Sequence, residues 1–211
     1  DASSEWCGYI NRALDGTFSS SGGFISSPFY NISSFKTEGI DFKINFSIDS
    51  RFGEIEINNF INILLKKTYQ ESLKEEERNC KGFYLLGNSD GLCYQPSPKF
   101  QNILNISIKR PTFGYDSEYN LTYRYIDSVK GYLYQNTSNN VSFKKMEYFD
   151  LNLNLSLEDD LDIYLGINNL LDSDPPINGD IGYVPGNANT FPSFYDPLGR
   201  YLFLKISKKI N

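Results

Sequence analysis

The most regular stretch of the sequence is an unbroken alternation of apolar and polar side chains from Phe149 to Leu157. A period of two residues is typical of a β-strand with one apolar and one polar face. The alternation stops at the acidic residues 158–160 and resumes from Asp162 to Asn168, which predicts two antiparallel strands joined by a tight turn. A long segment rich in Gly, Pro and Asn then leads to one more predicted strand, Tyr201 to Ile210.

The same alternation appears in four earlier segments of the chain. They are residues 39–48, 54–65, 99–110 and 115–127. Together with the three segments described above, they predict an all-β fold, an antiparallel up-and-down meander of about seven strands.

The predicted connections between these strands differ in length. The short ones fall near residues 49–53, 111–114 and 158–160, and the long ones at 71–98, 128–142 and 171–199. Because short and long connections alternate along the chain, all the short ones lie at one end of an antiparallel sheet. Outer-membrane barrels have this arrangement, with short periplasmic turns and long extracellular loops. Strands of about ten residues or more also suit a tilted crossing of a bilayer.

The alternation divides the strand residues into two predicted faces. The apolar face contains Ile40, Phe42, Ile44, Phe46, Leu151, Leu153, Leu155, Ile163, Leu165, Ile167, Leu202, Leu204 and Ile206. The polar face contains Asp41, Lys43, Asn45, Arg124, Asp150, Asn152 and Asn154. In a membrane barrel the first set faces lipid and the second lines the lumen, whereas in a soluble sheet the first set would form the protein core.

Composition excludes several classes of function. The chain has 211 residues, a net charge of −6 and scattered basic residues, so it lacks the clustered cations of a nucleic-acid-binding protein. It contains no His, which excludes Ser-His and Cys-His catalysis, and no Gly-rich phosphate loop or metal motif, so we expect neither an enzyme nor a bound cofactor or metal. The Asp clusters near residues 160 and 172 lack the spacing of an EF-hand and suit turns instead.

Three segments near the C-terminus resemble those of a known family. They are GINNLLDSDPP at 166–176, GNANTFP at 186–192 and YDPLGRY at 195–201. In combination they resemble the C-terminal end of TonB-dependent outer-membrane receptors. The motif positions are Asn168, Asn169, Asp172, Pro175, Pro176, Asp196, Pro197, Gly199 and Arg200. One departure from the family pattern is Ile210, which stands where the family usually has an aromatic residue.

The resemblance implies a 22-stranded transmembrane β-barrel of which this chain supplies the C-terminal portion. Residues 1–38 would be an extracellular loop region and residues 39–211 barrel strands, with the plug domain and TonB box upstream. The implied function is energy-coupled uptake of a scarce nutrient, an iron chelate, cobalamin or oligosaccharide, across the outer membrane of a Gram-negative bacterium. The implied partners are outer-membrane lipid, the TonB complex and a nutrient ligand at the extracellular loops.

Two cysteines fit this exported location. Cys80 and Cys93 fall in one predicted extracellular loop, and we expect them to form a disulfide in an oxidising compartment, with two free thiols as the alternative. Closing a loop of this size would stabilise the fold by roughly 3 kcal/mol in the chain-entropy model.

Two other classes of function stay open. A passive porin-type channel would share the barrel but lack a plug. A secreted soluble β-sandwich with a binding or adhesive role would bury the apolar face inside the protein. The position of that face therefore separates the membrane interpretations from the soluble one.

Overall fold

The computed structural model describes residues 5–18, 20–27, 33–70, 76–86, 93–133, 142–157, 161–177 and 189–209. The chain divides into two compact units, Asp1–Ser33 and Ser34–Asn211. The boundary lies five residues before the predicted one at 38/39, because the first long strand already begins at Ser34. Among the described residues, no helix combines the length and the apolar composition that crossing a membrane requires.

The small unit contains one turn of helix and one short hairpin. The 3-10 helix η1 (Glu5–Tyr9) leads into β1 (Ile10–Asn11), which pairs antiparallel with β2 (Phe24–Ile25). The Asp15 carboxylate accepts hydrogen bonds from the Thr17 amide at 3.0 Å and from the Ser20 hydroxyl, which holds the turn between the strands. These bonds, that from Ser20 first, lower the pKa of Asp15.

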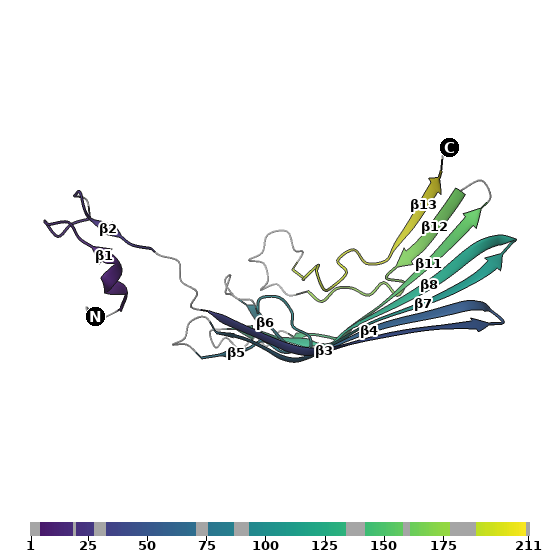
Figure 1. Cartoon of the computed structure of the whole chain (residues 1–211), viewed down its shortest axis with the longest axis horizontal. Coiled ribbons are helices and arrows are strands. Elements are labelled where there is room, and N and C mark those ends of the chain that lie inside the picture. The colour runs from purple at the N-terminus through teal and green to yellow at the C-terminus, as the bar shows by residue number, and fades with distance from the viewer. Residues whose placement is uncertain are drawn as a thin grey trace. The chain divides into compact units, whose positions relative to one another are not determined.

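The large unit is organised around one antiparallel sheet of seven long strands (Figure 1). Their order across the sheet is also their order along the chain, β3, β4, β7, β8, β11, β12 and β13. They are β3 (Ser34–Ser50), β4 (Gly53–Gln70), β7 (Phe100–Thr112), β8 (Tyr115–Ile126), β11 (Met146–Leu157), β12 (Leu161–Asn168) and β13 (Tyr201–Lys208). The prediction of an antiparallel meander of about seven strands is confirmed. Within the described chain, β3 and β13 are each paired on one side only, so the sheet is open.

The short connections are tight hairpins at one end of this sheet (Figure 1). Ser50 pairs with Gly53 and Thr112 pairs with Tyr115, so each of these turns has two central residues. Phe113 and Gly114 both have positive φ, 56° and 85°, as a type I′ turn requires. The reversal predicted at 158–160 lies outside the described residues.

The long connections, for which no strands were predicted, contain several short strands. β5 (Arg78–Asn79) pairs with the end of β4. β6 (Phe83–Leu86) runs parallel to β9 (Val129–Leu133), and β10 (Ser142–Phe143) pairs antiparallel with β9. This second small sheet joins segments from two different connections, so no local alternation could have predicted it.

The register of the long sheet places most apolar side chains on one face and most polar side chains on the other. Residues directly opposite each other in antiparallel strands share a face. One cross-strand row is Phe46, Ile57, Ile106, Leu121, Leu151, Ile167 and Leu202, and we call its side the apolar face. The next row is Ser47, Glu56, Ser107, Asn120, Asn152, Gly166 and Phe203, and its side is the polar face.

No layer of the described chain packs on the apolar face along the edge strands. Phe46 is 54% exposed in β3 and Leu202 is 75% exposed in β13. The buried hydrophobic side chains of the large unit gather instead where the long connections meet the sheet, around Tyr84, Phe143 and Tyr148. The long strands of the large unit therefore form one layer rather than the two layers of a sandwich.

Candidate functional site

The register assigns each residue of the two predicted sets to the expected face. The residues predicted to face lipid, on β3, β11, β12 and β13, lie on the apolar face. Asp41, Lys43 and Asn45 lie on the polar face of β3, while Asp150, Asn152 and Asn154 lie on the polar face of β11. Arg124 is opposite Tyr148 on the same polar face. Whether these faces meet lipid and water remains a prediction.

Arg124 is the centre of the strongest polar network on this face. Its Nε atom donates to Oδ2 of Asp150 at 3.2 Å, and its Nη2 atom lies 3.8 Å from Oδ2 of Asp196. Its guanidinium also lies over the Tyr148 ring, 4.8 Å from the centroid. The Asp196 amide donates to the Tyr148 hydroxyl at 3.2 Å. The network ties the β12–β13 connection to two central strands of the sheet.

A hydrogen bond between Asn169 and Asp150 is the second contact that joins the β12–β13 connection to the sheet. The fully buried Asn169 donates its backbone N–H to Oδ1 of Asp150 at 2.8 Å. Its side-chain amide donates to the Ser173 carbonyl and accepts from the Ser173 amide, both at 2.9 Å. The φ of Asn169 is 51°, a left-handed value that Asn tolerates better than most residues. One side chain thus stabilises the whole turn that follows β12.

The remaining motif residues lie in or beside the same connection. The Arg200 amide donates to Oδ1 of Asp172 at 2.8 Å, and the Leu198 amide donates to Oδ1 of Asp196 at 3.2 Å. Gly199 has a φ of 69°, and the side chain of Asn168 donates to the Tyr201 hydroxyl. Pro175, Pro176 and Pro197 lie in the same connection. These hydrogen bonds shape the loop between β12 and β13.

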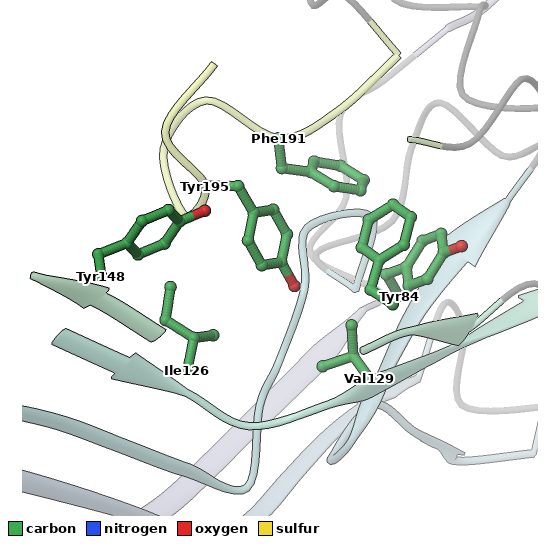
Figure 2. Packing of buried hydrophobic residues seen from close by; sticks show 7 residues of the cluster. Tyr84, Ile126, Val129, Tyr148, Phe191 and Tyr195 are labelled. Carbon is green, nitrogen blue, oxygen red and sulfur yellow. The ribbon is translucent and has the colours of Figure 1, made fainter. Parts of the chain in front are cut away.

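Three long connections meet in one aromatic cluster (Figure 2). Its members are Tyr84, Ile126, Val129, Phe143, Tyr148, Phe191 and Tyr195. Tyr84 stacks on Phe143 with ring centroids 4.7 Å apart, and Phe143 meets Tyr195 edge to face at 5.5 Å. Burial raises the pKa of the Tyr195 phenol, because the low-polarity surroundings disfavour the phenolate. The cluster fixes the long connections relative to one another.

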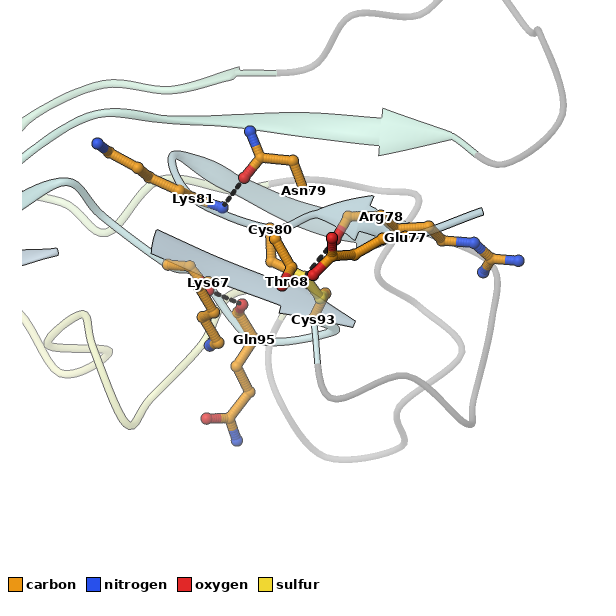
Figure 3. Close-up of a disulfide and its surroundings, with 10 residues drawn as sticks. Lys67, Thr68, Glu77, Arg78, Asn79, Cys80, Lys81, Cys93 and Gln95 are labelled. Atoms are coloured by element: carbon orange, nitrogen blue, oxygen red, sulfur yellow. Dashed lines mark hydrogen bonds between the residues drawn. A yellow bond between two sulfur atoms is a disulfide. The ribbon is translucent and has the colours of Figure 1, made fainter. Parts of the chain in front are cut away.

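The predicted disulfide between Cys80 and Cys93 is present (Figure 3). Both cysteines are buried against Tyr69, at the end of β4. The Cys80 amide donates to the Lys67 carbonyl at 2.8 Å. The disulfide closes a loop within the first long connection, and the hydrogen bond from Cys80 to Lys67 joins that loop to β4.

A hollow of about 340 Å³ lies on the polar face beside the β12–β13 connection. Phe60 and Ile103 form part of its wall and are 43% and 46% exposed. They belong to a cross-strand row that runs from Lys43 through Phe60 and Ile103 to Arg124. Ser193 and Phe194 of the connection close the other side. The hollow thus combines the apolar side chains of Phe60, Ile103 and Phe194 with the guanidinium of Arg124, a composition suited to an amphipathic ligand.

Phe60 and Ile103 are not among the candidate site residues predicted from the sequence. The signal was available, since both are apolar side chains at positions where their strands otherwise place polar ones. The structure also buries Tyr148 of β11 completely in the cluster. The cluster itself depends on distant segments and carries no local signal.

The described residues contain no group of three or more Cys, Asp or Glu side chains placed to hold a metal ion. Comparisons of the chain with protein-family models, curated proteins and solved structures found no match.

Proposed function

We propose that this chain forms part of the wall of a transmembrane β-barrel in an outer-membrane receptor of the TonB-dependent type. In this proposal the apolar face contacts lipid and the polar face lines the lumen of a 22-stranded barrel, closed by strands and a plug that other parts of the protein supply. The receptor takes up a scarce nutrient at the expense of energy delivered by the TonB complex. The long connections are extracellular and the hairpins periplasmic.

The observation that carries the proposal is the exposed apolar face. Ile40 and Ile48 mark the ends of the apolar stripe on β3, and both are exposed. At about 3.3 Å per residue this stripe is roughly 26 Å long, and its nine residues match the roughly 9–11 residues with which a tilted strand crosses a bilayer. A continuous apolar surface of this size is not tolerated in water by a monomeric soluble protein. Lipid would satisfy it without any further protein layer.

The open edges of the sheet give independent support. Every residue of β13 is exposed, and only the two end residues of β3 are half-buried. Long apolar edges with unpaired backbone groups invite aggregation, and closed barrels abolish them. Pairing of β3 and β13 with further strands would remove both edges.

The polar exceptions on the apolar face also fit a membrane setting. Asn59 is opposite Ile44 and Leu104, so its amide lies among aliphatic side chains. The Asn102 side chain on the neighbouring strand donates to the Asn59 side-chain oxygen and, at 3.2 Å, to the Phe60 carbonyl. A polar group in hydrocarbon needs such an internal partner, because no water is available there.

The hollow beside Phe60 and Arg124 is our candidate for contact with the nutrient. It lies on the proposed lumen side, near the long connections that would face the outside. One wall of the hollow is the β12–β13 connection. The hydrogen bond from Asn169 to Asp150, which also binds Arg124, holds this connection against the sheet. Pre-organised walls of this kind lower the entropic cost of ligand binding.

Energy-coupled transport separates this proposal from a passive channel. Cells that carry the natural protein would be supplied with radiolabelled iron chelates, cobalamin and oligosaccharides, with and without a protonophore that collapses the inner-membrane gradient. We expect accumulation of one substrate to stop when the gradient is lost. Uptake that continues unchanged would favour a porin-type channel, and the absence of the protein from the outer-membrane fraction would refute both.

A further inference from the structure

The charges near the hairpins are distributed unequally between the two faces of the sheet. The polar face carries a cross-strand row of Asp49, Glu54, Lys109, Glu118 and Asn154, and further acids at Glu56, Asp116 and Asp162. The apolar face ends in Arg110, two residues beyond Ile108, and in Lys208, two residues beyond Ile206. The register places no acidic side chain on the apolar face in these last rows of the described strands.

Lys109 and Arg110 are sequence neighbours with opposite surroundings. Lys109 lies 2.5 Å from Oε1 of Glu56 and 3.9 Å from Oε2 of Glu54, so the polar face neutralises its charge. Arg110 is exposed and makes no ion pair with the residues that the structure describes. Its guanidinium lies 5.5 Å from the centroid of the Tyr119 ring. The Arg110 cation is therefore available to an anion at the edge of the apolar face.

A trough on the apolar face includes Tyr119, the aromatic neighbour of this cation. Its volume is about 670 Å³, and it runs from Ile108 and Tyr119 to Leu204. The side chains between them include Leu121, Leu153 and Leu165, so the lining is almost wholly apolar. The Tyr119 ring belongs to the trough and to the contact with Arg110, which joins the two features.

We propose that this trough and Arg110 form a binding site for a glycerophospholipid with an anionic headgroup. The guanidinium binds the phosphate and an acyl chain lies along the trough. Arginine suits this role because its planar group can donate two parallel hydrogen bonds to phosphate. Lys208 lies four strand spacings away, roughly 19 Å, so it contacts the headgroup of a second lipid on the same edge. The inference rests on the proposed function, since it requires the apolar face to meet the bilayer.

The lining favours an acyl chain over a polypeptide segment as the occupant. A peptide would bring backbone N–H and C=O groups onto aliphatic side chains that offer no partner, and each unsatisfied group costs free energy. A hydrocarbon chain has no such groups. The charge of Arg110 then favours one class of headgroup. An anionic headgroup carries a net negative charge that attracts Arg110, whereas in a net-neutral headgroup a positive group offsets the phosphate.

Photolabelling in bilayer nanodiscs tests the site. The natural protein would be reconstituted with phosphatidylglycerol or phosphatidylcholine that carries a diazirine on one acyl chain, and labelled residues would be located by mass spectrometry. We expect labels on trough residues such as Leu121 and Leu153, with several-fold more label from phosphatidylglycerol. Arg110→Gln should reduce that preference about fivefold, as expected for one cation at an anionic surface. Arg110→Lys should retain most of it.

Lys109→Gln is the matched control, because it removes a neighbouring positive charge from the opposite face. It should change the headgroup preference less than about twofold. Equal labelling by both lipids in the unmodified protein, or equal losses in Arg110→Gln and Lys109→Gln, would overturn the lipid site while leaving the membrane proposal intact. Absence of label from the trough with either lipid would instead contradict the proposed function itself. Heat-modifiable mobility on gels would verify that each variant has folded.

Discussion

The middle of the apolar face and the aromatic cluster are both rich in large apolar side chains, but their surroundings differ. Phe46 on the apolar face is 54% exposed, whereas Phe143 in the cluster is 1% exposed. The cluster is sealed by the protein's own connections, while no described part of the chain covers the apolar face along its edge strands. The comparison indicates that the long connections have their own core and that the aliphatic stripe depends on an apolar environment outside the chain.

The largest expected effect is the loss of an aromatic ring from the cluster. Phe143→Ala removes contacts with Tyr84, Phe191 and Tyr195 and leaves a cavity, so we expect a loss of about 3–5 kcal/mol in the free energy of unfolding. Urea unfolding in lipid vesicles would measure it. Phe52→Ala, at an exposed hairpin tip, should change stability by less than about 0.5 kcal/mol. Similar losses in both variants would contradict the assignment of the cluster as a core.

The next effect concerns the apolar face in a bilayer. Leu153→Arg places a charge on the proposed lipid side and should cost roughly 2–4 kcal/mol at the bilayer midplane. Asn152→Arg puts the same side chain on the polar face one residue away, where water would solvate it, and should be much milder. The same vesicle unfolding assay compares them. Equal costs would refute the assignment of the two faces.

Removal of the disulfide should have an effect of similar or smaller size. The double variant Cys80→Ser, Cys93→Ser frees the first long connection, and the chain-entropy model gives a loss of roughly 3 kcal/mol. Reduction of the unmodified protein with dithiothreitol is the matched comparison. A loss that appears in the double variant but not on reduction would point to packing of the side chains rather than to the crosslink.

Asp150→Asn should loosen the β12–β13 connection more moderately. The change removes the charge that Arg124 contacts and weakens the bond from the Asn169 amide, so about 1–3 kcal/mol of local stability is at stake. Trypsin cleavage after Arg200 should become faster. Asp162→Asn, in a bond to Ser156 near the hairpins, serves as control and should leave this cleavage rate unchanged.

The smallest predicted effect is a pH dependence near the disulfide. A hydrogen bond from Thr68, followed by the charges of Lys36 and Lys66, lowers the pKa of Glu77. Because the folded form has the lower pKa, the contact stabilises β5 against β4 above the unfolded-state pKa and is lost as the pH falls through the folded value. Thr68→Val should move this loss to higher pH. Hydrogen exchange of the Asn79 amide would follow it, and an unchanged midpoint would contradict the role of Thr68.

The sequence predicted the long strands well because each carries its own alternation. The alternation within residues 40–48 and within residues 149–157 predicts the two faces of each strand without reference to a partner strand. The Phe113-Gly114 pair is typical of a tight turn. The predicted disulfide followed from the location of two cysteines in one connection. For the strands and the turn, the decisive information lies within a few neighbouring residues, whereas the two cysteines are 13 residues apart.

The candidate site was less predictable because its parts come from distant segments. Tyr84, Phe143 and Tyr195 have no common period, and only folding brings their rings together. Arg124 and Asp150 were assigned to the polar face, but their contacts with Asp196 and Asn169 depend on the path of a long connection. Phe60 and Ile103 become meaningful only when the register shows them side by side.

Spin-label accessibility at two neighbouring positions tests the central claim most directly. Labels would be attached to Leu153→Cys and Asn152→Cys in the natural protein in a bilayer, and their collision rates with oxygen and with a water-soluble nickel chelate would be compared. We predict that residue 153 meets oxygen far more than nickel, since oxygen concentrates in hydrocarbon, and that residue 152 meets nickel more. A label at residue 153 that neither reagent reaches, as in a protein core, or that nickel reaches freely, would contradict a lipid-facing apolar surface.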